Sequence, residues 1–134
     1  MTQLTFVNLI ESFRLIERKL SLILVETGLT LSLFRLLHRI ALHMPISASK
    51  LSQELGIAKP SVTSQLRELE KAGLVIISSN PDDKRSIFIS LSETGKVRFR
   101  IVCENIALLE EKSGKKLLSR LETLIQQVTE SMSK

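Results

Sequence analysis

The sequence predicts a mainly α-helical fold with one small β-hairpin. Apolar residues recur at helical spacing over most of the 134 residues. Two short helices joined by a tight glycine-containing turn are expected in residues 47–72. Two β-branched runs, "LVIIS" and "IFISL", follow directly and flank a turn-forming loop. A hairpin placed immediately after two such helices is typical of a winged helix-turn-helix.

Two helices are expected before this motif. Residues 5–26 place apolar side chains three and four positions apart, and Gly28 is expected to end the helix. Residues 30–43 follow, with Thr30 as the capping residue and Pro45 as the stop. The apolar stripe of this second helix consists of Leu33, Leu36, Leu37 and Ile40.

The helix-turn-helix itself has clear start and stop signals. Ser47 is a good N-cap for the first helix, and Gly56 ends it. The second helix is expected over about residues 59–72, with Pro60 tolerated in its first turn. Its inner face is formed by Val62, Leu66 and Leu69.

The chain returns to helical spacing after the hairpin. Ser92 or Thr94 is expected to cap a helix that "KSGKK" (112–116) interrupts, and a last helix covers about 115–132. The terminal helices carry more apolar surface than one copy of so short a chain can bury, which predicts a two-fold dimer. We expect a single domain of residues 1–134, with a winged-helix lobe at about 30–91 and dimerisation helices at about 1–28 and 92–134.

Composition and charge narrow the function. With 43% hydrophobic and 25% charged residues the chain is expected to be globular. No apolar run is long enough for a membrane span, and the early charges Glu11 and Arg14 argue against a signal peptide, so we expect a cytoplasmic, nucleoid-associated protein. Residues 46–100 hold nine basic and six acidic residues, a net charge of +3. This segment is the expected contact for a polyanion.

Four motifs in this segment resemble the MarR family of bacterial transcriptional regulators. They are the helix-turn-helix "LSQELGIAKPSVTSQLRELEKAGLV", its Leu69–Glu70 pair before Gly73–Leu74–Val75, the wing Asp83–Lys84–Arg85, and the helix opening Leu91–Ser92–Glu93–Thr94–Gly95. The resemblance implies a homodimeric regulator, usually a repressor, whose lobes a ligand or oxidation moves apart. The sequence departs from the family pattern at three positions. Ala58 stands where the family usually has a capping Ser or Thr, Pro60 stands where a polar residue is common, and Ser64 stands where a basic residue is common. These departures concern the preference for a particular DNA sequence.

Residue types on the second helix and the wing suit duplex DNA. In a winged helix the second helix enters the major groove, where its outward residues read base edges. We expect these to be Ser61, Thr63, Ser64 and Arg67, with phosphate contacts from Lys59, Lys50 and Ser47. On the wing, Arg85 is expected in a narrow minor groove and Lys84 at a phosphate. Asp83 is expected to face the protein and to accept from the Arg85 guanidinium or from backbone N–H groups of the turn.

Other chemistry has little support in the sequence. No P-loop, dinucleotide glycine motif or metal-ligand spacing is present, so we expect no enzyme, no cofactor and no metal. The single cysteine, Cys103, is interpreted as a buried inert thiol. The resemblance implies an effector pocket, for which Phe13, Phe34 and His38 are candidates, although core packing is the favoured interpretation of these residues. A protein-interaction module and an architectural DNA binder without effector response stay open as alternatives.

Overall fold

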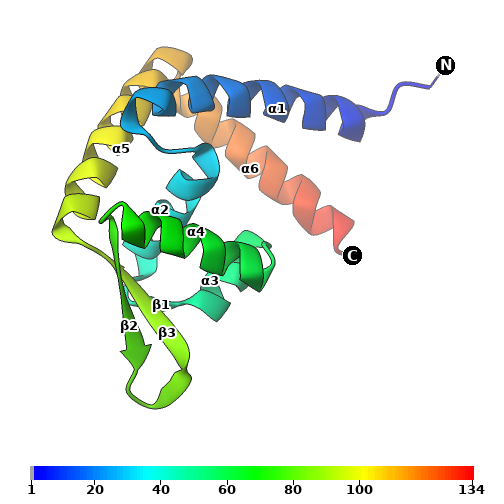
Figure 1. Cartoon of the computed structure of the whole chain (residues 1–134). Coiled ribbons are helices and arrows are strands. Elements are labelled where there is room, and N and C mark those ends of the chain that lie inside the picture. Colours follow the sequence, from blue (N-terminus) through cyan, green and yellow to red (C-terminus); the bar gives the residue numbers. More distant parts are fainter. Residues whose placement is uncertain (1) are drawn as a thin grey trace. The chain divides into compact units, whose positions relative to one another are not determined.

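The computed structural model describes residues 2–134, except for the side chain of Lys84, and divides the chain into two compact units that meet at Val102 and Cys103. The first unit contains most of the elements (Figure 1). Their order is α1 (Thr5–Leu24), the 3-10 helix η1 (Val25–Thr27), α2 (Leu31–His43), β1 (Ile46–Ser47), α3 (Ala48–Leu55), α4 (Lys59–Lys71), β2 (Val75–Asn80), β3 (Asp83–Leu91) and the start of α5 (Glu93–Ser113). The second unit holds the rest of α5 and α6 (Lys115–Met132).

The predicted caps begin and end the helices of the motif. The Thr30 hydroxyl accepts the Leu33 N–H at 3.1 Å, and the Ser47 hydroxyl accepts the Lys50 N–H at 3.1 Å. Gly56 ends α3 with a φ of 63°, a left-handed conformation that glycine adopts without a Cβ penalty. Among the described side chains none caps α4, as expected from Ala58, and Pro60 lies in its first turn.

One hydrophobic core holds α2, α3, α4 and the sheet together. The predicted stripes are confirmed: Leu36, Leu37 and Ile40 of α2 are fully buried, as is Leu51 of α3. From α4 and the sheet the core receives the buried side chains of Val62, Leu66, Leu69, Val75, Ile89 and Leu91. Figure 1 shows the β2–β3 hairpin projecting beyond α3 and α4. The fold is a winged helix-turn-helix, as the sequence predicts.

The sheet has three strands in the order β1–β3–β2, all antiparallel. The sequence predicts β2 and β3 but misses β1, in which Ile46 pairs with Ile89 and Ser47 with Phe88. A two-residue strand is too short to show alternation, so no sequence pattern marks it. Both hairpin strands also extend further than "LVIIS" and "IFISL", so the turn is shorter than the predicted loop.

The first residues of α5 are hydrogen-bonded to the turn that follows α4. The Ser92 hydroxyl accepts the Gly95 N–H at 2.9 Å, which confirms one of the two predicted caps, and donates to the Gly73 carbonyl at 2.6 Å. A Cβ on Gly95 would collide with the Leu74 carbonyl oxygen, so the close backbone approach requires glycine. The Leu-Ser-Glu-x-Gly motif therefore locks α5 against the entry of β2.

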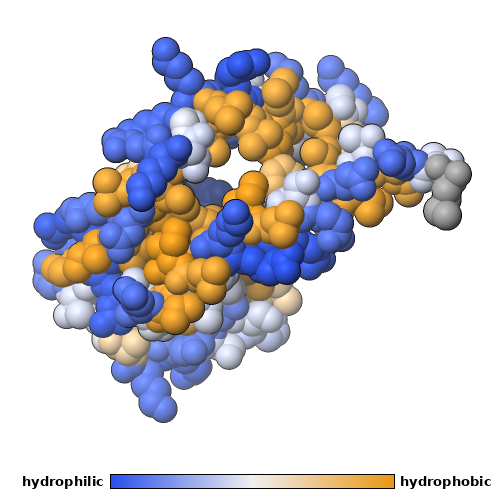
Figure 2. Space-filling model, turned by 90° about the horizontal axis from the view of Figure 1, so that it is seen from above, coloured by the Kyte–Doolittle hydropathy of each residue, from blue (hydrophilic) through white to orange (hydrophobic). Residues whose placement is uncertain are grey.

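The terminal helices expose much of their apolar surface. On α1, Phe6 is 54% exposed and Ile10 is 51% exposed, and on α6 Leu117 is 62% exposed. Figure 2 shows hydrophobic residues exposed on the face that is seen from above. No single helix of residues 2–134 is long and apolar enough to cross a membrane. The segments Thr5–Thr27 and Leu31–His43 meet the criteria only when taken together, and they are bent by 82° relative to each other.

Candidate DNA interface

The outward residues of α4 form a polar surface opposite its buried stripe. At 100° per residue, Ser64 and Arg67 lie opposite Val62, Leu66 and Leu69, with Thr63 and Ser61 on the two flanks. Lys59, Ser61, Ser64 and Arg67 are exposed, and Thr63 is half-buried. The Thr63 hydroxyl donates to the Lys59 carbonyl at 3.0 Å, so it is held close to the helix.

The wing brings a second segment to this surface. A hollow of about 140 Å³ lies between α3, α4 and β3 and is lined by Ala48, Ser49, Lys59, Thr63, Arg85, Ser86 and Ile87. Beside it, a hollow of about 130 Å³ is lined by Thr63, Leu66, Arg67, Glu70, Ile77 and Ile87. We call these two hollows together the α4–wing groove. Three predicted contact residues from α4, namely Lys59, Thr63 and Arg67, therefore share it with Arg85 of the wing.

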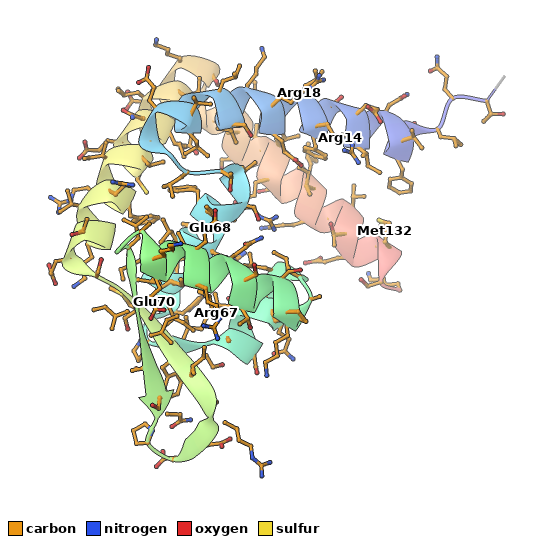
Figure 3. The ribbon with its side chains drawn as sticks, in the orientation of Figure 1. Arg14, Arg18, Arg67, Glu68, Glu70 and Met132 are labelled. Atoms are coloured by element: carbon orange, nitrogen blue, oxygen red, sulfur yellow. The ribbon has the colours of Figure 1, made fainter. Side chains whose placement is uncertain are left out.

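Acidic residues of α4 lie on both sides of the helix. Figure 3 shows Arg67 and Glu70 on the side of α4 toward the wing and Glu68 on the opposite side. Glu70 lines the α4–wing groove and was not predicted as a site residue. Its position three residues after Arg67, on the same helical face, is the sequence signal that could have found it. Among the described side chains, Lys59, Arg67 and Arg85 form no ion pair within 4.0 Å, so their charges are free for phosphate.

Short-range hydrogen bonds shape the tip of the wing. Asp83 Oδ1 accepts the backbone N–H of Arg85 at 3.0 Å, which is one of the two arrangements expected for this carboxylate. Asn80 Oδ1 accepts the Asp82 N–H at 3.0 Å, and Asn80 Nδ2 donates to the Ser86 hydroxyl at 3.1 Å. Arg85 stays exposed. The predicted contact from the Lys84 side chain lies outside the described part of the chain.

The expected phosphate contacts Ser47 and Lys50 line a different hollow. It has a volume of about 510 Å³ and is lined by His43, Pro45, Ile46, Ser47, Lys50, Glu54 and Phe88. Since side chains alternate along a strand, Phe88 points to the other side of β3 from Ile87, which lines the α4–wing groove. Here His43 Nε2 lies 3.7 Å from Glu54 Oε2. Lys50 is exposed, whereas the Ser47 hydroxyl already serves as the cap of α3.

The residues suggested for an effector pocket are only partly brought together. Phe34 is buried, and its ring stacks on Phe99 with centroids 5.6 Å apart. The His38 ring lies 6.2 Å from the same Phe99 ring, while Phe13 is half-buried on α1. Burial, with a smaller effect of Arg39, lowers the pKa of His38 below its ordinary value. Phe99 was missed because a lone aromatic in "VRFR" gives no positional signal.

Two residues of α5, Arg98 and Cys103, do not belong to the candidate DNA interface. Arg98 donates from Nη1 to the Thr27 carbonyl at 3.4 Å and so joins α5 to the end of η1. Burial raises the pKa of the half-buried Cys103 thiol, which disfavours the reactive thiolate. Neither residue adds to the α4–wing groove.

Comparison with known proteins relates the sequence of this chain to one family. The MarR family model matches residues 29–87. An HTH-type transcriptional regulator of Staphylococcus aureus (strain Mu50) is 29% identical over 76 residues, which is 57% of this chain and 52% of the relative, so the match spans about half of the relative's length.

Solved structures share this fold over most of the chain's residues. The transcriptional repressor CouR, bound to a 23-mer DNA duplex, superposes with a TM-score of 0.86 at 20% identity, covering 94% of this chain and 92% of that one. MarR of Staphylococcus aureus, in complex with salicylate and kanamycin, gives a TM-score of 0.83 at 22% identity, covering 96% and 89%. The predicted resemblance is thereby confirmed: residues 29–87 of this chain match the MarR family model, and the chain has the winged helix-turn-helix fold of these solved structures.

Proposed function

We propose that the protein binds double-stranded DNA sequence-specifically as a homodimer and regulates transcription as a repressor. The observation that carries this proposal is the α4–wing groove, where Lys59, Thr63 and Arg67 of α4 meet Arg85 of the wing. These side chains come from two segments that a winged helix presents to adjacent grooves of DNA. Such convergence of unpaired cations has no role in the packing of the core.

Each residue has a role that follows from its position. Arg67 projects from α4 opposite the buried stripe and is suited to a bidentate contact with the O6 and N7 atoms of guanine. Ser61, Thr63 and Ser64 supply hydroxyls to base edges or nearby phosphates. Lys59 and Lys50 bind phosphate, and the N-terminus of α3, which Ser47 caps, lies beside them. Arg85 enters the minor groove, with the loop shaped by Asp83.

The dimer is supported by the apolar surface left open on α1 and α6. Exposed side chains on these helices include Phe6, Ile10, Ile16, Leu117, Leu124 and Val128. A second copy of the chain would cover them through a self-complementary contact. Two lobes related by a two-fold axis would then bind a pseudo-palindrome with half-site centres about one helical turn apart. The 23-mer duplex bound to CouR is long enough for two such half-sites.

Repression and effector control rest on the relatives. CouR is a transcriptional repressor, and MarR of Staphylococcus aureus was solved with salicylate and kanamycin. In this chain the aromatic cluster of Phe34, His38 and Phe99 is the candidate location for a small effector. Binding there would act on α2 and the start of α5, and through them on the lobe that carries α4.

Selection of bound duplexes from a random pool, followed by fluorescence anisotropy on the winners across a salt series, tests this proposal. Enrichment of an inverted repeat, with affinity that falls steeply with salt, is the expected result. Salt-sensitive binding without enrichment would instead identify an architectural DNA binder. No binding at all would leave the winged helix as a protein-interaction module, for which the open apolar surfaces of α1 and α6 would provide the contact.

A further inference from the structure

A polar contact ties the recognition helix α4 to the first turn of α2. Gln65 is half-buried on α4, and its Nε2 donates to the Ser32 hydroxyl at 3.0 Å. The two residues are 33 positions apart in the chain, and Ser32 is the second residue of α2. Gln65 lies between Ser64 and Arg67, which face the proposed DNA surface.

The side-chain contact of Gln65 is directional, whereas the contacts of the inward apolar side chains of α4 are not. Among the described side chains, those of α4 make one further hydrogen bond, from Thr63 to the Lys59 carbonyl within the same helix. Backbone hydrogen bonds such as that from the Leu74 N–H to the Leu69 carbonyl at 3.0 Å hold the C-terminal end of α4. Along its length, α4 is held to the core by apolar packing of Val62, Leu66 and Leu69. Hydrophobic contact is non-directional and tolerates small rotations, but a hydrogen bond weakens steeply with its angle. The Gln65–Ser32 bond is therefore suited to define the rotation of α4 about its own axis.

Gln65 is a poor choice for stability alone. Its Oε1 is buried, and no group among the described residues forms a hydrogen bond with it. A buried amide oxygen without a partner opposes folding, and an apolar side chain of similar volume would avoid this cost. Gln65 therefore contributes less to the free energy of folding than an apolar side chain of similar volume would, while its Nε2 keeps the bond to Ser32.

We propose that Gln65 is a positioning residue, which uses its bond to Ser32 to set the orientation in which α4 presents Ser64 and Arg67 to DNA. The inference deepens the proposed function and rests on it. Ser32 follows the Thr30 cap of α2 and the Gly28 turn, where η1 ends. The bond therefore makes the orientation of the recognition helix depend on the junction between η1 and α2.

Four variants separate positioning from general stability. Gln65→Met removes the bond together with the unpaired oxygen, and Ser32→Ala removes the acceptor. Ser32→Thr keeps a hydroxyl and is the matched control. The double variant Gln65→Met/Ser32→Ala tests whether the two side chains act as a pair.

Two readouts are needed on each full-length variant. We expect Gln65→Met to keep or raise the melting temperature while the affinity of the dimer for the selected duplex falls by about ten- to 100-fold, the equivalent of one hydrogen bond in each of the two lobes. Ser32→Ala and the double variant should lose a similar factor, and Ser32→Thr should bind like the unmodified protein. Amide hydrogen exchange of the DNA-free protein should show faster exchange in α4 of Gln65→Met, with α3 as the internal reference.

The outcomes distinguish this inference from the proposed function. If Gln65→Met binds the duplex as tightly as the unmodified protein, or if its loss of affinity accompanies an equal loss of stability, the positioning role is wrong. An equal loss in Ser32→Thr and Ser32→Ala would also overturn it. If the unmodified protein binds no duplex, the proposed function is wrong. Unchanged amide exchange in α4 of Gln65→Met would show, independently of DNA binding, that the Gln65–Ser32 bond does not hold α4 in place.

Discussion

Replacing Arg85 with alanine should weaken DNA binding without unfolding the wing. The Arg85 side chain is exposed, and no described carboxylate pairs with it. The turn is held instead by the Arg85 backbone N–H on Asp83 Oδ1, together with the bonds from Asn80. Truncation at Cβ removes the guanidinium and leaves each of these hydrogen bonds in place.

The magnitude follows from the two-fold arrangement. Each neutralised phosphate contributes about 0.9 to the slope of log K against log salt concentration, so loss of one contact in each of two lobes should make the slope shallower by about 1.8. If each arginine contributes at least about 1 kcal/mol, at the low end for specific contacts, the dimer should lose about 2 kcal/mol, or roughly 30-fold in affinity.

The assay is fluorescence anisotropy with the selected duplex between about 50 and 200 mM salt. Arg14→Ala is the matched control because it removes the same side chain from α1, outside the α4–wing groove (Figure 3). Equal slopes for Arg85→Ala, Arg14→Ala and the unmodified protein would refute a minor-groove contact by the wing. Circular dichroism of both variants should be unchanged.

Three further predictions concern the surrounding structure. Gly95→Ala should lower the melting temperature by several degrees, because the added Cβ meets the Leu74 carbonyl oxygen and overpacking costs about 1–3 kcal/mol. The pKa of His38 is lowered in the folded state, so its contribution to stability should be present above the ordinary pKa of 6.5 and be lost as pH falls through the folded value; urea titrations of His38→Gln should show a weaker dependence on pH. Because burial raises the pKa of Cys103, iodoacetamide at neutral pH should alkylate it more slowly in the native protein than in urea.

Local signals allowed much of the fold to be predicted. Thr30 and Ser47 cap the helices that follow them, and Gly56 ends α3, because each feature depends on residues within one turn. The inward stripe of α4 was equally accessible from its spacing. The strand β1 was not, since its two residues acquire their role only by pairing with Phe88 and Ile89 across the fold.

The candidate site shows the same division between local and distant information. Arg85 and Arg67 were found from their place in the motif, and Asp83 from its spacing to Arg85. The convergence of Lys59, Thr63 and Arg85 on one groove depends on how the hairpin folds back against α4, which no pattern in either segment encodes. Ser32 and Gln65 likewise meet across 33 positions, so their bond appears only in three dimensions.

Directed cleavage of the operator from the wing tip would test the central claim most directly. An iron–EDTA reagent attached to Asp82→Cys in a Cys103→Ser background would cut DNA only where the wing meets it. One wing in the minor groove of each half-site predicts two sets of cuts related by two-fold symmetry, each staggered toward the 3′ ends of the strands. Uniform cutting along the duplex, or a single set of cuts, would contradict a dimer that places one winged helix on each half-site.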